Sequence, residues 1–157
     1  KKRDKEMIYL CAISNLSSGY CGEDCKFCTQ SAHYKTDIHT YKEKNIDEVI
    51  KEAIKAKNNK AVGFCLVTSG KGLNDKKLEY VCRVAYEVSK QVDLSLIGCN
   101  GTASIEQLKE LKKVGILNYN HNLETSKEFY PNICSTHSWE ERFQTCENVK
   151  KVGLNLC

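Results

Sequence analysis

Proline and long apolar stretches are both scarce in this sequence. Its 157 residues include one proline, one tryptophan and one methionine. The longest apolar stretches, such as VGFCLV and LSLIG, fall far short of the roughly 20 residues that a membrane-spanning helix requires. The run MIYLCAI near the start is too short for a secretory signal. The sequence therefore predicts a cytoplasmic protein with no membrane partner.

The sequence also lacks a large excess of charge of either sign. Its formal net charge is +4, and lysines alternate with glutamate and aspartate along stretches expected to form helices. Such mixed charge is typical of solvated helix faces, whereas nucleic-acid-binding surfaces cluster their positive charge. We therefore expect no nucleic-acid partner, and we expect residues 1–6, KKRDKE, to be a solvated start.

Apolar residues follow two alternating patterns along the whole chain. Short apolar runs predict strands at residues 7–13, 61–67, 92–99, 116–122 and 154–157. Amphipathic stretches with capping signals predict helices at residues 45–57, 74–90, 104–115 and 138–153. This order predicts an α/β fold with parallel strands, right-handed crossovers and strands buried on both faces.

Two architectures fit this order: a doubly wound sheet and part of a (β/α)8 barrel. A complete barrel takes roughly 250 residues, so this chain amounts to somewhat more than half of one. The fifth strand begins on the last residues of the sequence, and position 1 is not methionine. We therefore expect the chain to be a fragment.

Cysteine is the one residue type in clear excess, with ten copies. An even number would suggest disulfides in a secreted domain. However, the predicted core needs no such crosslinks, and no export signal is visible. We therefore interpret the cysteines as reduced thiols, some of them metal ligands.

Three of the cysteines stand together as CxxxCxxC within SGYCGEDCKFCTQSAH: Cys21, Cys25 and Cys28. Thiolates are soft ligands that favour zinc, copper(I) and iron–sulfur clusters. His33 supplies a fourth ligand by count, so a zinc site in a structural module fits these residues. A 4Fe-4S cluster on three cysteines instead leaves one iron open for a cofactor or substrate.

Further thiols and polar residues gather where the predicted strands end. Cys65 lies in the second strand, Cys99 ends the third, YNHN (119–122) ends the fourth, and Cys157 lies in the fifth. In α/β folds, sites are built at the carboxyl ends of parallel strands. We therefore expect these segments and the CxxxCxxC loop to meet at one end of the sheet.

The CxxxCxxC loop after the first strand, with Phe27 before the last cysteine, resembles that of the radical S-adenosylmethionine (radical SAM) enzymes. The resemblance implies a parallel (β/α) barrel of the TIM type, of which residues 1–157 form a partial domain truncated at its C-terminus. It implies a 4Fe-4S cluster on Cys21, Cys25 and Cys28, with S-adenosylmethionine on the open iron and Phe27 near the adenine. In that family, an electron from the cluster cleaves the cofactor to a 5′-deoxyadenosyl radical, which abstracts hydrogen from an unactivated C–H bond.

A closer resemblance, along nearly the whole chain, is to the biotin synthase family. It is carried by GYCGEDCKFCTQSAHYKT, GFC, YNHNLETS, EFYPNI and GLNLC. It implies sulfur insertion into dethiobiotin to give biotin, with sulfur from an auxiliary iron–sulfur cluster, 2Fe-2S or a variant. It further implies an electron donor such as flavodoxin or ferredoxin, and a homodimer at full length. The alternatives are another radical SAM enzyme on a similar barrel, such as a hydrogenase-maturase-like protein, and the zinc module.

The same resemblance implies roles for individual residues. In that family three cysteines and an arginine hold the auxiliary cluster. Cys65 matches the first cysteine by its FC context, and Cys157 matches the third, so the arginine would lie beyond the chain. Asn122 and Glu124 match side chains that bind the cofactor ribose and the substrate.

Three positions depart from the biotin synthase pattern. Gly63 replaces an arginine before FC, and Glu124 replaces an aspartate. Ile97 occupies the place of the middle cluster cysteine, and Cys99 follows two residues later. Because strand side chains repeat with a period of two, we expect Cys99 to face the same way as Ile97, one layer nearer the barrel mouth. Cys99 is therefore the predicted third thiolate, with Cys134 as the alternative.

Other candidates come from position or have structural interpretations. Thr68 and Ser69 follow the second strand, and we expect their turn to present backbone groups to the amino-acid end of S-adenosylmethionine. Lys71 lacks the spacing of a phosphate-binding loop. His121 fits a core or a functional role equally well. Packing or surface roles are expected for the other cysteines and histidines: Cys11, Cys82 and Cys146 in packing, and His33, His39 and His137 in loops or on the surface.

Overall fold

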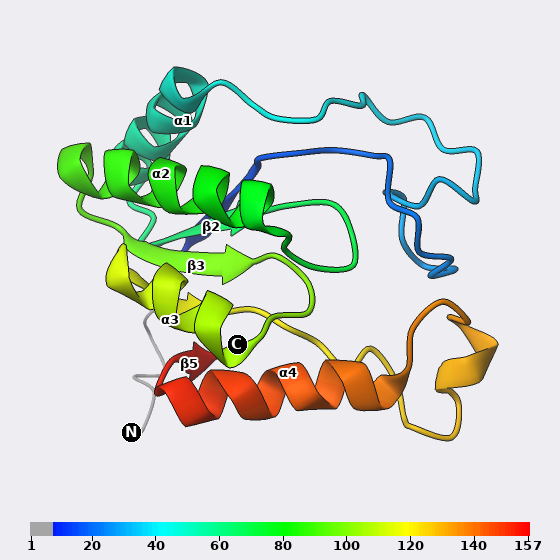
Figure 1. Cartoon of the computed structure of the whole chain (residues 1–157). Helices are drawn as coiled ribbons and strands as arrows, with labels where there is room; N and C mark the ends of the chain where they lie inside the picture. The colour runs from blue at the N-terminus through cyan, green and yellow to red at the C-terminus, as the bar shows by residue number, and fades with distance from the viewer. Residues whose placement is uncertain (1–7) are drawn as a thin grey trace.

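Five parallel strands form one sheet in the computed structural model, which describes residues 8–157 (Figure 1). The strands are β1 (Cys11–Asn15), β2 (Gly63–Val67), β3 (Ser95–Cys99), β4 (Ile116–Tyr119) and β5 (Asn155–Leu156). The helices are α1 (Ile46–Asn58), α2 (Asp75–Gln91), α3 (Ile105–Lys113) and α4 (Trp139–Val152), with a 3₁₀ turn η1 at Tyr130–Asn132. The predicted alternation of strands and helices is confirmed. The stretch KKRDKE lies outside the described residues.

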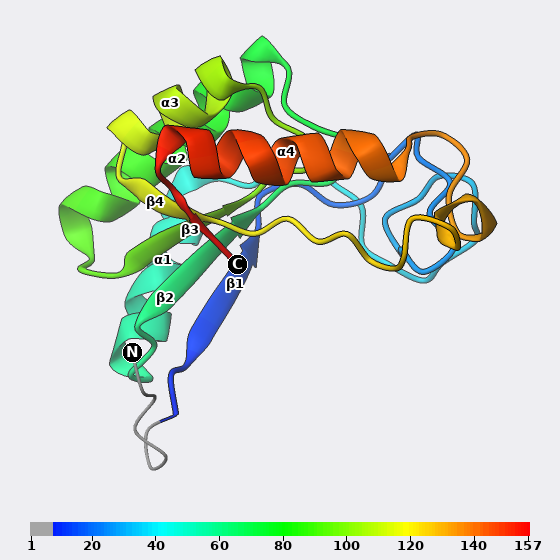
Figure 2. The same cartoon turned by 90° about the horizontal axis from the view of Figure 1, so that it is seen from below.

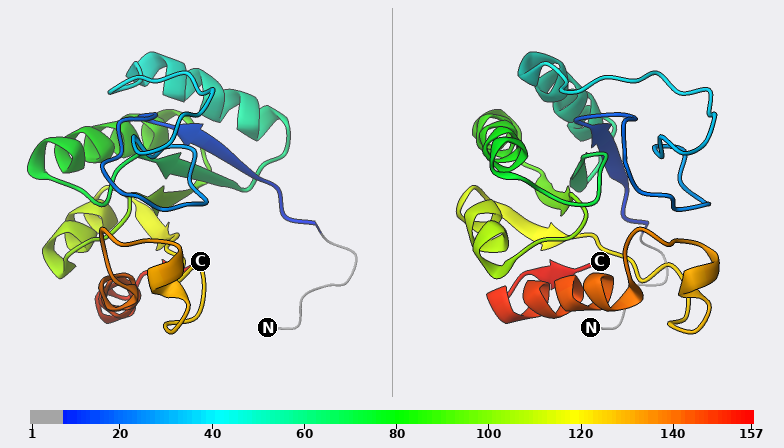
Figure 3. Two further views of the ribbon diagram at one scale, coloured as in Figure 1. Left: turned by 90° about the vertical axis from the view of Figure 1, so that its right-hand side faces the viewer. Right: turned by 45° about the vertical axis from the view of Figure 1, so that its right-hand side comes forward.

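The order of the strands identifies the architecture. Each strand pairs in parallel with the next one in sequence, which gives the order β1-β2-β3-β4-β5. A doubly wound sheet reverses its strand order at a switch point, whereas a (β/α) barrel adds each strand beside the previous one. All four α-helices lie on the same side of the sheet (Figures 2 and 3). The sheet is therefore an arc of a (β/α) barrel with its helices on the outer face.

The helices begin and end where the sequence places its capping signals. The side chain of Asn45 accepts a hydrogen bond from the backbone of Asp47 at the start of α1. Ser138 and Glu141 form a capping box at the start of α4. Gly153 ends α4 with a positive φ of 71°, a conformation that glycine adopts without strain. These caps fix the lengths of the helices and hence the points at which the chain returns to the sheet.

The bounds of every strand differ from the sequence prediction, as β1 and β4 illustrate. Pairing of β1 with β2 begins at Cys11, opposite Gly63, and the side chains of Ile8 and Tyr9 before it are exposed. At the other end of the sheet, β4 stops at Tyr119, before the last residues of the predicted strand. Each apolar run therefore forms a strand only where its backbone pairs with a neighbouring strand.

The core lies between the sheet and the helices. Phe64 and Leu66 of β2 point toward the helices and are buried in one cluster with apolar residues of α1, α2 and α3. The opposite, inner face is more open than predicted, because the side chain of Ile13 is 68% exposed there. The prediction of strands buried on both faces is therefore wrong for β1. Within residues 8–157, no helix combines the length and apolar character needed to cross a membrane.

We predict that Leu66→Ala destabilises the protein by about 2–5 kcal/mol, because it removes a fully buried side chain from the central part of the core. Leu117→Ala in β4 is the matched control, since that side chain is 53% exposed, and should cost less than about 1 kcal/mol. Urea unfolding of both variants measures the difference. Equal losses in the two variants would contradict the packing described for β2.

Candidate metal centre

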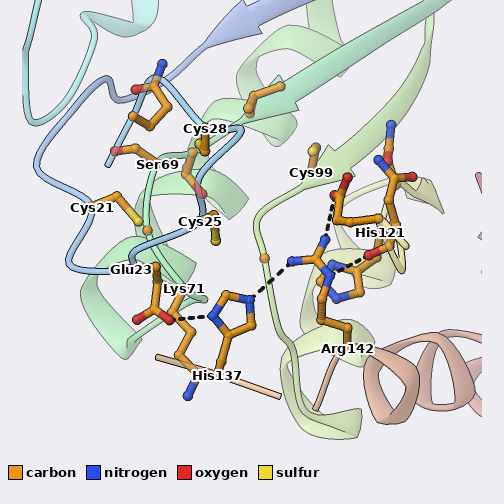
Figure 4. Close-up of a pocket in the computed structure, with 18 of the residues that line it drawn as sticks. Cys21, Glu23, Cys25, Cys28, Ser69, Lys71, Cys99, His121, His137 and Arg142 are labelled. Atoms are coloured by element: carbon orange, nitrogen blue, oxygen red, sulfur yellow. Dashed lines mark hydrogen bonds and ion pairs between the residues drawn. The ribbon is translucent and has the colours of Figure 1, made fainter. Parts of the chain in front are cut away.

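The CxxxCxxC loop leaves β1 and folds back on itself beyond the ends of the strands (Figure 1). The backbone N–H of Cys21 donates to the carbonyl of Gln30, and the N–H of Ala32 donates to the carbonyl of Cys21. The N–H of Cys28 donates to the carbonyl of Cys25 at 3.0 Å. These bonds direct the three cysteine side chains into one pocket (Figure 4).

The three thiols share one electrostatic environment. Cys21 and Cys25 are buried, and Cys28 is half-buried. Burial raises the pKa of Cys21, and it is also the main cause that raises the pKa of Cys25 to about 12. The thiol of Cys28 adds to both shifts. Cys28 therefore acts electrostatically on both buried thiols, and metal binding to thiols such as these releases protons.

The donor set fits an iron–sulfur cluster better than the zinc site that includes His33. His33 is exposed, and its Nε2 lies 2.9 Å from the carbonyl oxygen of Gly22. It therefore contributes no ligand to the pocket. The three soft thiols lie on one wall of a pocket that is also lined by Ser69, Asn122 and Glu124. Such a site leaves the position that a bound cofactor fills in a three-cysteine cluster.

A chain of hydrogen bonds crosses the pocket from the cysteine loop to the segment after β4 (Figure 4). The carboxylate of Glu23 lies 2.5 Å from Nδ1 of His137. A guanidinium N–H of Arg142 lies 3.4 Å from Nε2 of His137, and another donates to the carboxylate of Glu124 at 2.9 Å. Arg142 also donates to the carbonyl of Asn122. The carboxylate of Glu124 and the backbone of Asn122 are thus fixed relative to the CxxxCxxC loop.

A second contact ties the cysteine loop to the segment that precedes α4. The carboxylate of Asp24 accepts hydrogen bonds from the hydroxyl and the backbone N–H of Ser135 and from the N–H of Thr136. The bonds from Ser135 are the main cause that holds the pKa of Asp24 well below its usual range. The loop therefore has a fixed position although it contains no helix or strand of its own.

Cys134 lies in this segment, beside the CxxxCxxC thiols. It is buried, and its Sγ is 3.6 Å from Sγ of Cys25 and 3.3 Å from Nδ1 of His137. Among the described residues, Cys25, Cys134 and His137 form the one group of three or more possible metal-ligand atoms that all lie within 4.8 Å of one another. Cys134 does not lie with Cys65 on the sheet, which counts against it as the alternative ligand of the auxiliary cluster.

The predicted cofactor-binding residues line the same pocket: Phe27, Thr68, Ser69, Asn122 and Glu124. The Thr68 hydroxyl accepts a hydrogen bond from the Asn100 side chain, and the backbone N–H of Ser69 donates to the Ser17 hydroxyl. The backbone of Gly70 reaches the Cys21 thiol and lowers its pKa against the effect of burial. The turn after β2 is therefore directly beside the cysteine loop. Lys71 pairs with Glu141 at 2.6 Å.

The remaining predicted ligands lie on the inner face of the sheet. Cys65 pairs in register with Ile97, and Val67 with Cys99, so Cys99 stands on the same face as Ile97 and one inward position nearer the mouth. The interaction between the Cys65 and Cys99 thiols is the main cause that raises the pKa of Cys65 and lowers that of Cys99. Cys157 adds to the shift at Cys65. The three thiols therefore face one another across the arc.

Some residues differ from their sequence interpretation. His137, expected on the surface, is buried, because Glu23 and Arg142 hold it inside the pocket. Cys11, expected to pack in the core, is exposed on the inner face. No sequence pattern marks Glu23, His137 and Arg142 as pocket residues, since their association depends on the fold of the segment between β4 and α4. His33 and His39 are exposed as predicted.

The comparisons with known proteins agree with this geometry. The radical SAM superfamily model matches residues 15–157, and the chain belongs to that superfamily. Membership implies a 4Fe-4S cluster and S-adenosylmethionine. Solved structures with the same fold include an FeFe-hydrogenase maturase from Carboxydothermus hydrogenoformans, with a TM-score of 0.79 and 19% identity over 93% of this chain and 35% of the maturase. A methylornithine synthase aligns with a TM-score of 0.77 and 19% identity over 95% of this chain and 43% of the synthase.

Curated relatives are much more similar in sequence. A biotin synthase of Campylobacter lari is 68% identical over 151 residues, which cover 96% of this chain and 54% of the relative. A biotin synthase of Aliarcobacter butzleri is 67% identical with the same coverage. The chain thus spans about half the length of the curated relatives it matches.

We predict an acid-sensitive step in stability at His121. Burial, with the positive charge of Arg142 nearby, lowers the pKa of His121 from 6.5 to about 4. The unfolded chain therefore binds a proton in this range while the folded chain does not, so stability falls as the pH drops from about 6.5 to 4, by about 3 kcal/mol. Urea unfolding of the cluster-free protein across this range should show a smaller loss in His121→Gln. Identical pH profiles of parent and variant would contradict the burial described for His121.

Proposed function

We propose that this chain is the first part of the (β/α) barrel of a biotin synthase, which converts dethiobiotin to biotin by radical SAM sulfur insertion. The observation that carries the proposal is the pocket itself, where the CxxxCxxC thiols face Asn122, Glu124 and Arg142 across one cavity. The high sequence identity to proteins named biotin synthase, along 96% of this chain, supports the same proposal.

Three thiols hold the cluster in this proposal. Cys21, Cys25 and Cys28 bind the 4Fe-4S cluster, which when bound supplies the electron that cleaves S-adenosylmethionine to a 5′-deoxyadenosyl radical. The backbone of the turn at Thr68 and Ser69 contacts the amino-acid end of the cofactor. The shared pocket supports this arrangement, because both segments line it.

The other wall of the pocket binds the nucleoside and the substrate. Phe27 packs near the adenine, and Asn122 and Glu124 hold ribose hydroxyls and substrate. Arg142 supports this role, because it binds the carboxylate of Glu124 and the carbonyl of Asn122 and so orients both residues. Glu124 has a positive φ of 66°, a conformation that a non-glycine residue keeps only when its surroundings hold it.

The sulfur donor lies deeper in the barrel. Cys65, Cys99 and Cys157 bind the auxiliary iron–sulfur cluster, 2Fe-2S or a variant. The strand register supports this set, because Cys65 and Cys99 stand on the same inner face of neighbouring strands. Cys99 also lines the pocket that contains the CxxxCxxC thiols, so a cluster on Cys99 is adjacent to the proposed cofactor site. A sulfur donor needs that position, because its sulfur must contact the substrate carbon after hydrogen abstraction.

The broader context of the enzyme follows from this proposal. Dethiobiotin is the substrate, and flavodoxin or ferredoxin supplies electrons to the cluster. The complete protein works as a homodimer in the cytoplasm, and residues 1–157 form a partial barrel domain.

We predict that Cys21→Ala, Cys25→Ala or Cys28→Ala in the complete protein abolishes cleavage of S-adenosylmethionine, because each removes one of the three cluster ligands. The measurement is 5′-deoxyadenosine formation under reducing, anaerobic conditions. Cys82→Ala is the control, since Cys82 packs against the core on the outer side, and should cleave at the parental rate. Parental cleavage by any of the three ligand variants, or a colourless zinc protein without iron and sulfide, would refute the proposal.

We predict that Cys99→Ser retains the first cluster and cofactor cleavage but loses biotin formation and part of the bound sulfide. Cys134→Ser should still form biotin, because Cys134 lies beside Cys25 rather than on the inner face of the sheet. Biotin, 5′-deoxyadenosine and acid-labile sulfide are measured together in both variants. Normal biotin formation by Cys99→Ser and none by Cys134→Ser would show that Cys134, and not Cys99, is the third ligand of the auxiliary cluster.

A further inference from the structure

Cys11 has a position that its expected packing role does not explain. It is exposed, lies in β1 and pairs in register with Gly63 of β2. The residues of β1 that face the helices are Ala12, which packs against the core cluster, and Ser14, which is buried. Because strand side chains alternate between faces, Cys11 points to the inner face, the face that also carries Cys65 and Cys99.

The space that the Cys11 thiol occupies exists because residue 63 is glycine. A Cβ added to Gly63 would lie 2.7 Å from Sγ of Cys11 and 3.3 Å from Cδ1 of Ile97. Gly63 does not have a positive φ, so its backbone does not require glycine. The absent side chain instead leaves room for the thiol of Cys11 beside β2.

The Cys11 thiol also acts electrostatically on two of the proposed cluster ligands. Its thiol contributes to the raised pKa of Cys65 and to that of Cys157, although other causes are larger for each. The register shows how the thiols are arranged. Cys11 is opposite Gly63, two residues before Cys65, and Cys65 is opposite Ile97, two residues before Cys99. The thiols of β1, β2 and β3 therefore form a diagonal across the inner face.

We infer that Cys11 is a fourth thiolate ligand of the auxiliary iron–sulfur cluster, together with Cys65, Cys99 and Cys157. The inference rests on the proposed function, which supplies the auxiliary cluster. Each thiol loses its proton when it binds iron. Four thiolates complete the protein ligands of an iron–sulfur cluster, so the arginine expected as a ligand beyond the chain is not needed. The role of Gly63, where the family pattern has arginine, is to admit the Cys11 thiol.

The test isolates the auxiliary cluster in the complete protein. In a background with Cys21→Ala, Cys25→Ala and Cys28→Ala, anaerobic reconstitution with ferrous iron and sulfide loads only the inner site. Iron, acid-labile sulfide and the absorption and Mössbauer spectra are then compared between this background, Cys11→Ala and Cys82→Ala. We expect Cys11→Ala to lose iron and sulfide or to change the Mössbauer parameters of the cluster. Cys82→Ala should match the background.

Gly63→Ala provides a second variant that keeps every thiol. The added methyl group displaces Sγ of Cys11, so this variant should show the same loss as Cys11→Ala. Adding Gly63→Ala to Cys11→Ala should then cause no further loss, because the thiol that the methyl group displaces is already absent. A general defect in folding would instead add to the loss.

Alkylation of the otherwise unmodified protein gives an independent readout. With the auxiliary cluster loaded, Cys11 should resist iodoacetamide, and it should react once chelation removes the cluster; mass spectrometry measures both states.

The outcomes separate the two proposals. If the background lacking the CxxxCxxC thiols binds a cluster that Cys11→Ala leaves unchanged in amount and spectrum, the role of Cys11 is refuted and the proposed function stands. Reaction of Cys11 at the same rate with and without the cluster leads to the same conclusion. If that background binds no cluster and Cys65→Ala in the unaltered protein loses neither sulfide nor biotin formation, the auxiliary site and the Cys11 inference fail together.

Discussion

The two-residue period of parallel strands paired in chain order is the constraint on which the other features of this chain depend. It sends Phe64 and Leu66 to the helices and the alternate residue Cys65 to the inner face. Because neighbouring strands keep one register and one direction, thiols from β1, β2 and β3 appear on the same face. The same parallel direction brings the loops after β1, β2 and β4 to one end, where they line the pocket. The alternation of strand side chains therefore places apolar residues against the helices and the candidate metal ligands on the inner face.

The mouth of the pocket depends on contacts that no strand provides. The CxxxCxxC loop is folded by its own backbone hydrogen bonds, and the segment before α4 fixes its position relative to the sheet. Asp24 accepts hydrogen bonds from Ser135 and Thr136, and Glu23 contacts His137. These contacts join residues more than a hundred positions apart, so the position of the loop over the pocket depends on the segment that follows β4. The capping box of α4 at Ser138 directly follows these contacts and fixes where the helix begins.

The sequence alone predicts the fold and much of the pocket, for identifiable reasons. Strand and helix order follows from local periodicity and caps, and CxxxCxxC is contiguous, so both are visible without coordinates. The position of Cys99 relative to Ile97 is also predictable, since it needs only the strand period. The burial of His137 and the inward position of Cys11 are not. The burial of His137 depends on partners from two distant segments. The inward position of Cys11 depends on where β1 begins to pair, and the continuous apolar run before Cys11 does not indicate that point.

The hydrogen bonds of His137 bear on whether the mouth of the pocket holds a single metal ion or a cluster. Arg142 has only N–H donors, so Nε2 of His137 accepts from it, and the proton lies on Nδ1 facing Glu23. Nδ1 is the nitrogen nearest the Cys134 thiol. To bind a metal ion beside Cys25 and Cys134, it would have to lose that proton and turn a lone pair toward the carboxylate of Glu23. The hydrogen-bond chain therefore disfavours a zinc site at these three residues. The thiols of the CxxxCxxC loop remain as the ligands, and three thiols with an open fourth position suit a cluster that binds its cofactor.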